Sequence, residues 1–139
     1  MIKEVCHDLK ILSSPSTPLL ESDDLSVIED LKDTLIANRD KCVGMAANMI
    51  GVLKNVIVFV DEEGFVRCMV NPVIVKKSEP YDAKEGCLSL DEGERPCKRY
   101  KKINVEFLSE DFKRRKKSYK GFVAEIIQHE VDHLTGIII

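Results

Sequence analysis

The stretch FVAEIIQHEVDHL, residues 122–134, decides the fold of this chain. Its apolar residues recur at intervals of three and four, which is the spacing of one face of an α-helix. Gly136 follows shortly after the stretch, and glycine is a natural helix stop. We therefore predict a helix from residue 122 to about 134, with a broad apolar face formed by Phe122, Val123, Ile126, Ile127 and Leu134.

The same stretch contains His129-Glu130-Val131-Asp132-His133, an HExxH motif. Histidines four residues apart lie one above the other on a helix, so both imidazoles can reach one metal ion. Glu130 lies about 100° further round the axis, where its carboxylate can act on a water at that ion. Independent placement of three His and thirteen Glu in 139 positions gives about 0.006 such matches per chain. A metal site is therefore favoured over the alternative, an exposed charged turn of helix.

A catalytic metal needs three protein ligands and an open position, so one ligand must come from outside this helix. The best candidate is Cys87 in the sequence EGCLS, residues 85–89, because the preceding glycine lets the backbone turn closely around a site. The alternative is that Cys87 is a small buried apolar residue, which is the usual role of an unpaired cysteine. The third histidine, His7, follows Cys6 near the N-terminus, and we expect it on the surface.

The remaining sequence predicts another helix and several strands. An amphipathic helix is expected from residue 23 to about 39, with cap candidates among residues 22–24. Residues 55–60 and 65–70 are rich in β-branched residues and flank the turn DEEG, which is typical of a hairpin. Pro72 is expected to interrupt the second strand before a short strand at 73–75. With a further alternating strand at 103–107, this order indicates an α+β fold with mostly antiparallel strands.

Length and composition indicate a single globular domain, residues 1–139. Hydrophobic residues make up 44% and charged residues 32%, which is ordinary for such a domain. The N-terminal sequence MIKEVCHDLK carries charges where a secretory signal needs an apolar run, and no window holds the ~18 apolar residues of a membrane span. Five scattered cysteines do not suggest a disulfide framework. We therefore expect a cytoplasmic protein with no membrane partner.

The formal net charge of −3 conceals a strongly basic segment. Residues 95–120, which we call the basic band, hold eleven Lys and Arg against three Asp and Glu. Such a band could bind RNA phosphates by counterion release, which would give a weak contact with the ribosome. The alternative, which we favour, is a solvated strand and hairpin whose lysines prevent edge-to-edge aggregation.

Three motifs together resemble the signature motifs of the peptide deformylase family. They are GMAANMIG at 44–51, EGCLS at 85–89 and QHEVDHL at 128–134, and they occur in the family's order. The resemblance implies a compact α+β domain in which antiparallel sheets enclose a central HExxH helix. It also implies metal-dependent hydrolysis of the N-formyl group from formylmethionyl peptides or nascent chains, with Fe2+ as the cellular metal and Zn2+, Ni2+ or Co2+ as substitutes.

The resemblance also assigns roles to residues. It makes Cys87, His129 and His133 the metal ligands and Glu130 the general base and acid. The backbone N–H of Leu88 would help to hold the developing oxyanion. It implies that Val43, Gly44 and Gly86 bind the substrate. It also implies an ion pair between Glu85 and Arg99 at the metal loop.

Some positions depart from the family pattern. Met49 stands where the family has a Gln whose side chain donates a hydrogen bond to the formyl oxygen, and a thioether has no N–H. Asn48 could supply the donor only after a local shift, because it lies about 100° away on a helix. Cys42 replaces a Gly of the first motif, and Asp91 replaces a Pro, and both changes border the expected substrate groove.

Three functions follow from these observations. The first is a metal-dependent deformylase, for which slow turnover or a different acyl group is a further possibility. The second is a deformylase-like paralogue with weak or no activity that acts as a binding or regulatory protein, which Met49 favours. The third is a generic metallopeptidase, which the thiolate of EGCLS disfavours. The complete set of ligands and Glu130 favours the first.

Overall fold

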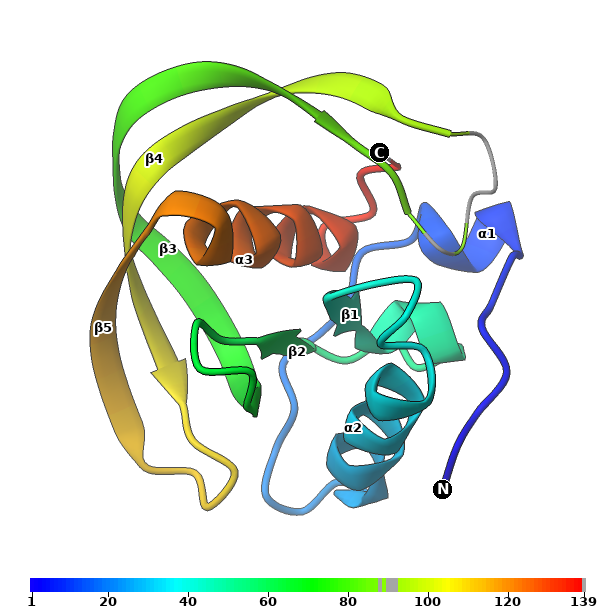
Figure 1. The fold of residues 1–139 in the computed structure, drawn as a ribbon. Helices are drawn as coiled ribbons and strands as arrows, with labels where there is room; N and C mark the ends of the chain where they lie inside the picture. The colour runs from blue at the N-terminus through cyan, green and yellow to red at the C-terminus, as the bar shows by residue number, and fades with distance from the viewer. Residues whose placement is uncertain (88, 90–92, 139) are drawn as a thin grey trace.

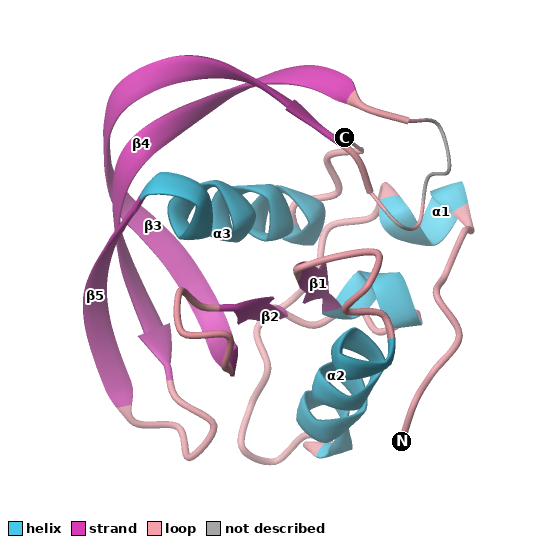
Figure 2. Ribbon diagram, in the orientation of Figure 1, coloured by secondary structure: helices cyan, strands magenta, loops and turns pink. Residues whose placement is uncertain are grey.

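The computed structural model describes residues 1–87, 89 and 93–138. Within these residues the strands form an antiparallel five-stranded sheet in the order β1-β2-β3-β4-β5, and the sheet curves around helix α3 (Figure 1, Figure 2). The α+β fold with an enclosed HExxH helix is thus confirmed. The elements are α1 (Leu9–Leu12), α2 (Ser26–Ala37), β1 (Gly44–Ala46), the 3-10 helix η1 (Ala47–Ile50), β2 (Val56–Val60), β3 (Val66–Glu85), β4 (Arg95–Leu108), β5 (Arg114–Lys120) and α3 (Gly121–Leu134).

Strand β2 is buried on both faces, which explains why its sequence lacks the alternation of a half-exposed strand. Ile57 and Phe59 belong to a core that contains Ile127 of α3. Val56 and Val58 point to the opposite face and belong to a second core, which contains the apolar side of α2. The sheet therefore separates two hydrophobic cores, one around each long helix.

Strand β3 runs without a break, so the expectation that Pro72 ends one strand before another at 73–75 is wrong. The pairing of β3 with β4 shifts register across this proline, as a β-bulge does. Asn71 has a φ of 52°, and its side chain bonds to both the N–H and the C=O of Leu19. The irregularity bends the strand and anchors the bend to the N-terminal segment, and pairing continues on both sides of it.

The helices are short, and none in the described part of the chain is long and apolar enough to span a membrane. Helix α2 begins at Ser26, because Asp24 accepts a hydrogen bond from its backbone N–H and the chain before it forms a turn. Phe122, expected on the apolar face of α3, is 64% exposed. It lies in the first turn of α3, directly after β5 ends, where the helix extends beyond the core.

Gly44 allows β1 to lie unusually close to α3. A Cβ atom at this position would lie 2.7 Å from Cγ2 of Ile126 and 2.9 Å from Oε2 of Glu130. Both side chains are buried, so neither can move aside freely. The glycine therefore permits the contact between β1 and the HExxH helix.

Gly44→Ala should lower the free energy of unfolding by about 1–3 kcal/mol, because the added methyl overpacks a buried contact. Gly86→Ala is the control, since a Cβ there would meet its nearest neighbour, the carbonyl oxygen of Gly93, at 3.7 Å. The free energy of unfolding of Gly86→Ala should fall by less than about 0.5 kcal/mol. Urea unfolding followed by circular dichroism measures both changes. Equal losses in the two variants would show that the close approach at Gly44 is unimportant.

Candidate metal centre

Cys87, His129 and His133 bring their ligand atoms together at one point. The sulfur and the imidazole nitrogens all lie within 4.8 Å of one another. The two Nε2 atoms are 2.9 Å apart, and the rings meet edge to face at 79°. Helix α3 supplies both histidines, and the segment after β3 supplies the cysteine. One sulfur and two imidazole ligands suit a divalent transition metal such as iron or zinc.

Glu130 lies beside this cluster with part of its carboxylate unsatisfied. The side chain is buried, and its Oε1 atom has no hydrogen-bond partner. Burial raises the pKa of Glu130 to about 7, which is where a group that both accepts and returns a proton is most effective. A buried carboxylate oxygen without a protein partner normally accepts a hydrogen bond from a water or a ligand. The carboxylate and the three ligands therefore fit a hydrolytic metal site.

A buried ion pair holds His129 in position. Arg99 of β4 donates to both carboxylate oxygens of Glu85, with Nη2 at 2.7 Å from Oε1 and Nε at 3.1 Å from Oε1 and 2.9 Å from Oε2. His129 Nδ1 lies 2.7 Å from Glu85 Oε1, and because a carboxylate only accepts, Nδ1 donates. The same carboxylate helps to raise the pKa of His129 to about 10, and when the ring is neutral the proton stays on Nδ1 and leaves Nε2 able to bind a metal. Burial alone would raise the pKa of Glu85. Hydrogen bonds from His129 and Arg99 outweigh this effect and lower the pKa to about 2.

Asp132 extends this network, and sequence reasoning missed it. Its Oδ2 accepts a hydrogen bond of 2.6 Å from Nη1 of Arg99. The available signal was its place three residues after His129, on a neighbouring part of the helix surface. Asp132 and Glu85 together hold the guanidinium of Arg99 on two sides.

The cluster opens into a pocket of about 570 Å3, which we call the cluster pocket. The expected substrate-binding residues Val43, Gly44 and Gly86 all line it, as does Met49. Leu88, expected to hold the oxyanion, lies outside the described residues, and so does Asp91. His7 lies apart from the ligands, and its Nδ1 is 2.7 Å from the carbonyl oxygen of Ser89.

Met49 presents no hydrogen-bond donor to the cluster pocket. Its sulfur lies 3.4 Å from the backbone nitrogen of Ala46 and accepts from it. The neighbouring Asn48 is buried, and its Nδ2 donates to the carbonyl oxygen of His133 at 2.8 Å. Asn48 therefore supports the end of α3 and is not among the residues that line the cluster pocket, so the alternative in which it replaces the missing donor is not supported.

Comparison with known proteins finds relatives that match the chain along its length. The polypeptide deformylase family matches residues 2–139 of the chain. A peptide deformylase of Clostridium beijerinckii is 49% identical over 139 residues, which is 100% of both chains. A peptide deformylase of Legionella pneumophila superposes with a TM-score of 0.88 at 31% identity, over 98% of this chain and 82% of that one. The Met-Ala-Ser-bound class I type b peptide deformylase of Acinetobacter baumannii superposes with a TM-score of 0.87 at 26% identity, over 99% and 96%.

A family match over nearly the whole chain, together with a relative of 49% identity along its full length, establishes membership of that family. This protein belongs to the polypeptide deformylase family.

Proposed function

We propose that this protein removes the formyl group from the amino terminus of formylmethionyl peptides, with a divalent metal held by Cys87, His129 and His133. The observation that carries the proposal is the three-ligand cluster beside a buried carboxylate with an unpartnered oxygen. The peptide in the Acinetobacter baumannii structure, Met-Ala-Ser, begins with methionine, as a deformylated product does. Such a reaction belongs to protein biosynthesis, where the substrate is a nascent chain.

The metal, when bound, supplies a Lewis acid that polarises the formyl carbonyl and makes a water more acidic. We propose Fe2+ as the cellular ion, with Zn2+, Ni2+ or Co2+ as substitutes, and the mixed sulfur and nitrogen ligands support this range. Glu130 holds the proton of the attacking water on its carboxylate and returns it to the leaving amine. Arg99 and Glu85 keep the His129 ring in one orientation throughout.

Two variants should separate metal binding from proton transfer. Cys87→Ala removes a ligand, so most of the bound metal should be lost from anaerobically purified protein. Cys6→Ala, a control at another half-buried cysteine, should keep about one ion per chain.

Glu130→Gln should also keep the metal but lose about 100-fold or more in formate release, because an amide cannot carry the proton. Elemental analysis and a formate assay measure the two effects. Full metal in Cys87→Ala, or near wild-type turnover in Glu130→Gln, would contradict the assigned roles.

We expect the side chain at position 49 to limit the rate of the reaction. A deformylase that lacks one amide donor to the oxyanion is expected to be slow, since such a donor contributes about 10²–10³ in rate. The Met49 side chain lines the cluster pocket, so a polar side chain of similar length, such as glutamine, would reach the same space. The sulfur contact with Ala46 is weak and easily replaced.

Met49→Gln should raise kcat/KM on formyl-Met peptides by about tenfold or more, with the gain in kcat rather than KM. Met49→Leu is the matched control, because it fills the same volume without a donor and should leave the rate near that of the natural protein. If Met49→Gln stays inert with full metal and intact Glu130, the non-catalytic paralogue becomes the better interpretation.

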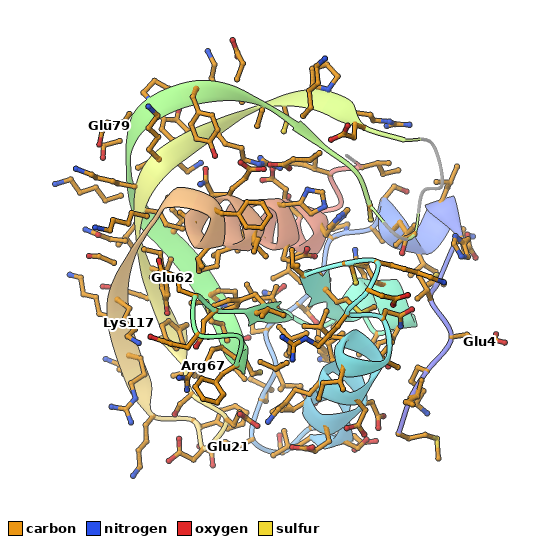
Figure 3. The ribbon with its side chains drawn as sticks, viewed as in Figure 1. Glu4, Glu21, Glu62, Arg67, Glu79 and Lys117 are labelled. Carbon is orange, nitrogen blue, oxygen red and sulfur yellow. The ribbon has the colours of Figure 1, made fainter. Side chains whose placement is uncertain are left out.

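We also propose a weak contact between the basic band and RNA, as the alternative to the solvated edge that the sequence favours. The band forms strands β4 and β5, and β5 is the outer strand of the sheet. Residues 113–117 are all basic and exposed, and Lys117 lies on β5 in Figure 3. Lys102 and Lys120 lie opposite each other in register, and Lys102 also forms an ion pair of 3.2 Å with Glu79. The exposed basic residues 113–117 are therefore the part of the band that would contact a polyanion.

Binding of a fluorescent RNA 20-mer should weaken steeply as salt rises from about 50 to 200 mM. The double variant Arg115→Glu, Lys117→Glu should bind at least about tenfold more weakly and with a shallower salt dependence. Lys10→Glu, at an exposed lysine on α1, is the control and should bind like the natural protein. Fluorescence anisotropy measures all three. Equal binding by the double variant would leave the band as a solvated edge that prevents aggregation.

A further inference from the structure

The residue that supplies the sulfur ligand, Cys87, belongs to no helix or strand. Strand β3 ends at Glu85, two residues earlier, so the regular hydrogen bonds of the sheet do not reach the cysteine. The position of its sulfur therefore depends on contacts made by the residues on either side. On the side toward β3, Glu85 is buried and held by Arg99.

On the other side of Cys87, the ring of His7 holds Ser89. Nδ1 of His7 lies 2.7 Å from the carbonyl oxygen of Ser89, and because a carbonyl only accepts, Nδ1 donates. Ser89 is 2% exposed, and a buried carbonyl oxygen needs such a partner. The Ser89 hydroxyl has no hydrogen-bond partner within the described residues, so it does not fasten this segment. Because Ser89 is at most about 7 Å from Cys87 along the chain, the bond from His7 also restrains the ligand.

His7 is exposed, as expected from the sequence, but the residues next to it are held in place. The backbone N–H of Cys6 donates to the carbonyl oxygen of Met49 at 2.7 Å, and Met49 lines the cluster pocket. On the other side of His7, the side chain of Asp8 caps helix α1. Residues 6–8, which we call the N-terminal strap, thus join one wall of the cluster pocket to the segment that carries the sulfur ligand.

We propose that His7 is a positioning residue of the metal centre, which acts through Ser89 to keep Cys87 within reach of the two histidine ligands. The proposal rests on the metal site of the function proposed above. The structural alternative is that His7 only fastens the N-terminal strap and adds to overall stability.

Two substitutions at His7 separate these roles. His7→Ala removes the donor to Ser89. His7→Asn keeps a donor, because its side-chain NH2 is separated from Cβ by the same number of bonds as Nδ1 of histidine. A positioning role therefore predicts a defect in the first variant and rescue in the second.

The first test uses the metal-free protein and measures how fast iodoacetamide alkylates Cys87, read by mass spectrometry of its peptide. His7→Ala should raise the rate at least about threefold, because loss of the hydrogen bond lets the segment open more often. His7→Asn should restore the natural rate. Cys97 is the internal reference, since it is also half-buried but lies within strand β4, and its rate should not change. An unchanged rate at Cys87 in His7→Ala would overturn the proposal.

The second test measures release of Co2+ from the loaded protein into a chelator. His7→Ala should release the ion at least about threefold faster, a smaller effect than the 10–100-fold that follows loss of a group bonded directly to a ligand. Asp8→Ala is the matched control, because it removes the cap of α1 and leaves the bond to Ser89 in place. It should lower the free energy of unfolding and keep the natural release rate.

Equal release rates in His7→Ala and Asp8→Ala would overturn the proposal, since they would show that His7 contributes only to the stability of the strap. The outcome does not depend on turnover. If no formyl peptide releases formate but alkylation of Cys87 changes as expected, the proposed function fails and the positioning role of His7 stands.

Discussion

The ion pair between Arg99 and Glu85 is the contact on which the metal centre depends, because it fixes the imidazole of His129. Glu85 ends β3, Arg99 lies on β4 and His129 lies on α3, so one interaction joins three elements at the site. Burying two charges carries a desolvation penalty that the pair only partly recovers, so the pair adds little to stability. Its benefit is positional, since the carboxylate selects the histidine tautomer that can bind a metal.

The second constraint is the close approach of β1 to α3 at Gly44. It places the segment that follows β1 against the HExxH helix, which brings Met49 to the wall of the cluster pocket and Asn48 to the end of α3. The two side chains are adjacent in sequence but serve different purposes. Met49 lines the cluster pocket and offers no donor, and Asn48 uses its amide to hold the backbone of α3 at His133.

The basic band and the ligand cluster line different hollows of the molecule. The basic band occupies β4 and β5, and a hollow of about 1110 Å3 along these strands contains none of the three ligand residues. Arg99 is the member of the band that turns inward, where two carboxylates surround it. The cluster pocket is lined by carboxylates, among them Glu125 and Glu130, and by Lys41 and Lys84, so charges of both signs surround it.

The sequence by itself determined the features that depend on spacing along the chain. The helix around HExxH, the β2–β3 hairpin and the α+β class follow from local periodicity, and the motif at Cys87 identified the third member of the cluster. Four features could be seen only in the folded chain: β3 continues past Pro72, Asp132 holds Arg99, Asn48 donates to His133, and Glu125 accepts a hydrogen bond from Tyr81. The reason is that the last three depend on contacts between residues 33 to 85 positions apart, such as Arg99 with Asp132, Tyr81 with Glu125 and Asn48 with His133. Strand register and the curvature of the sheet around α3 set those contacts, and no pattern within a short window of sequence encodes them.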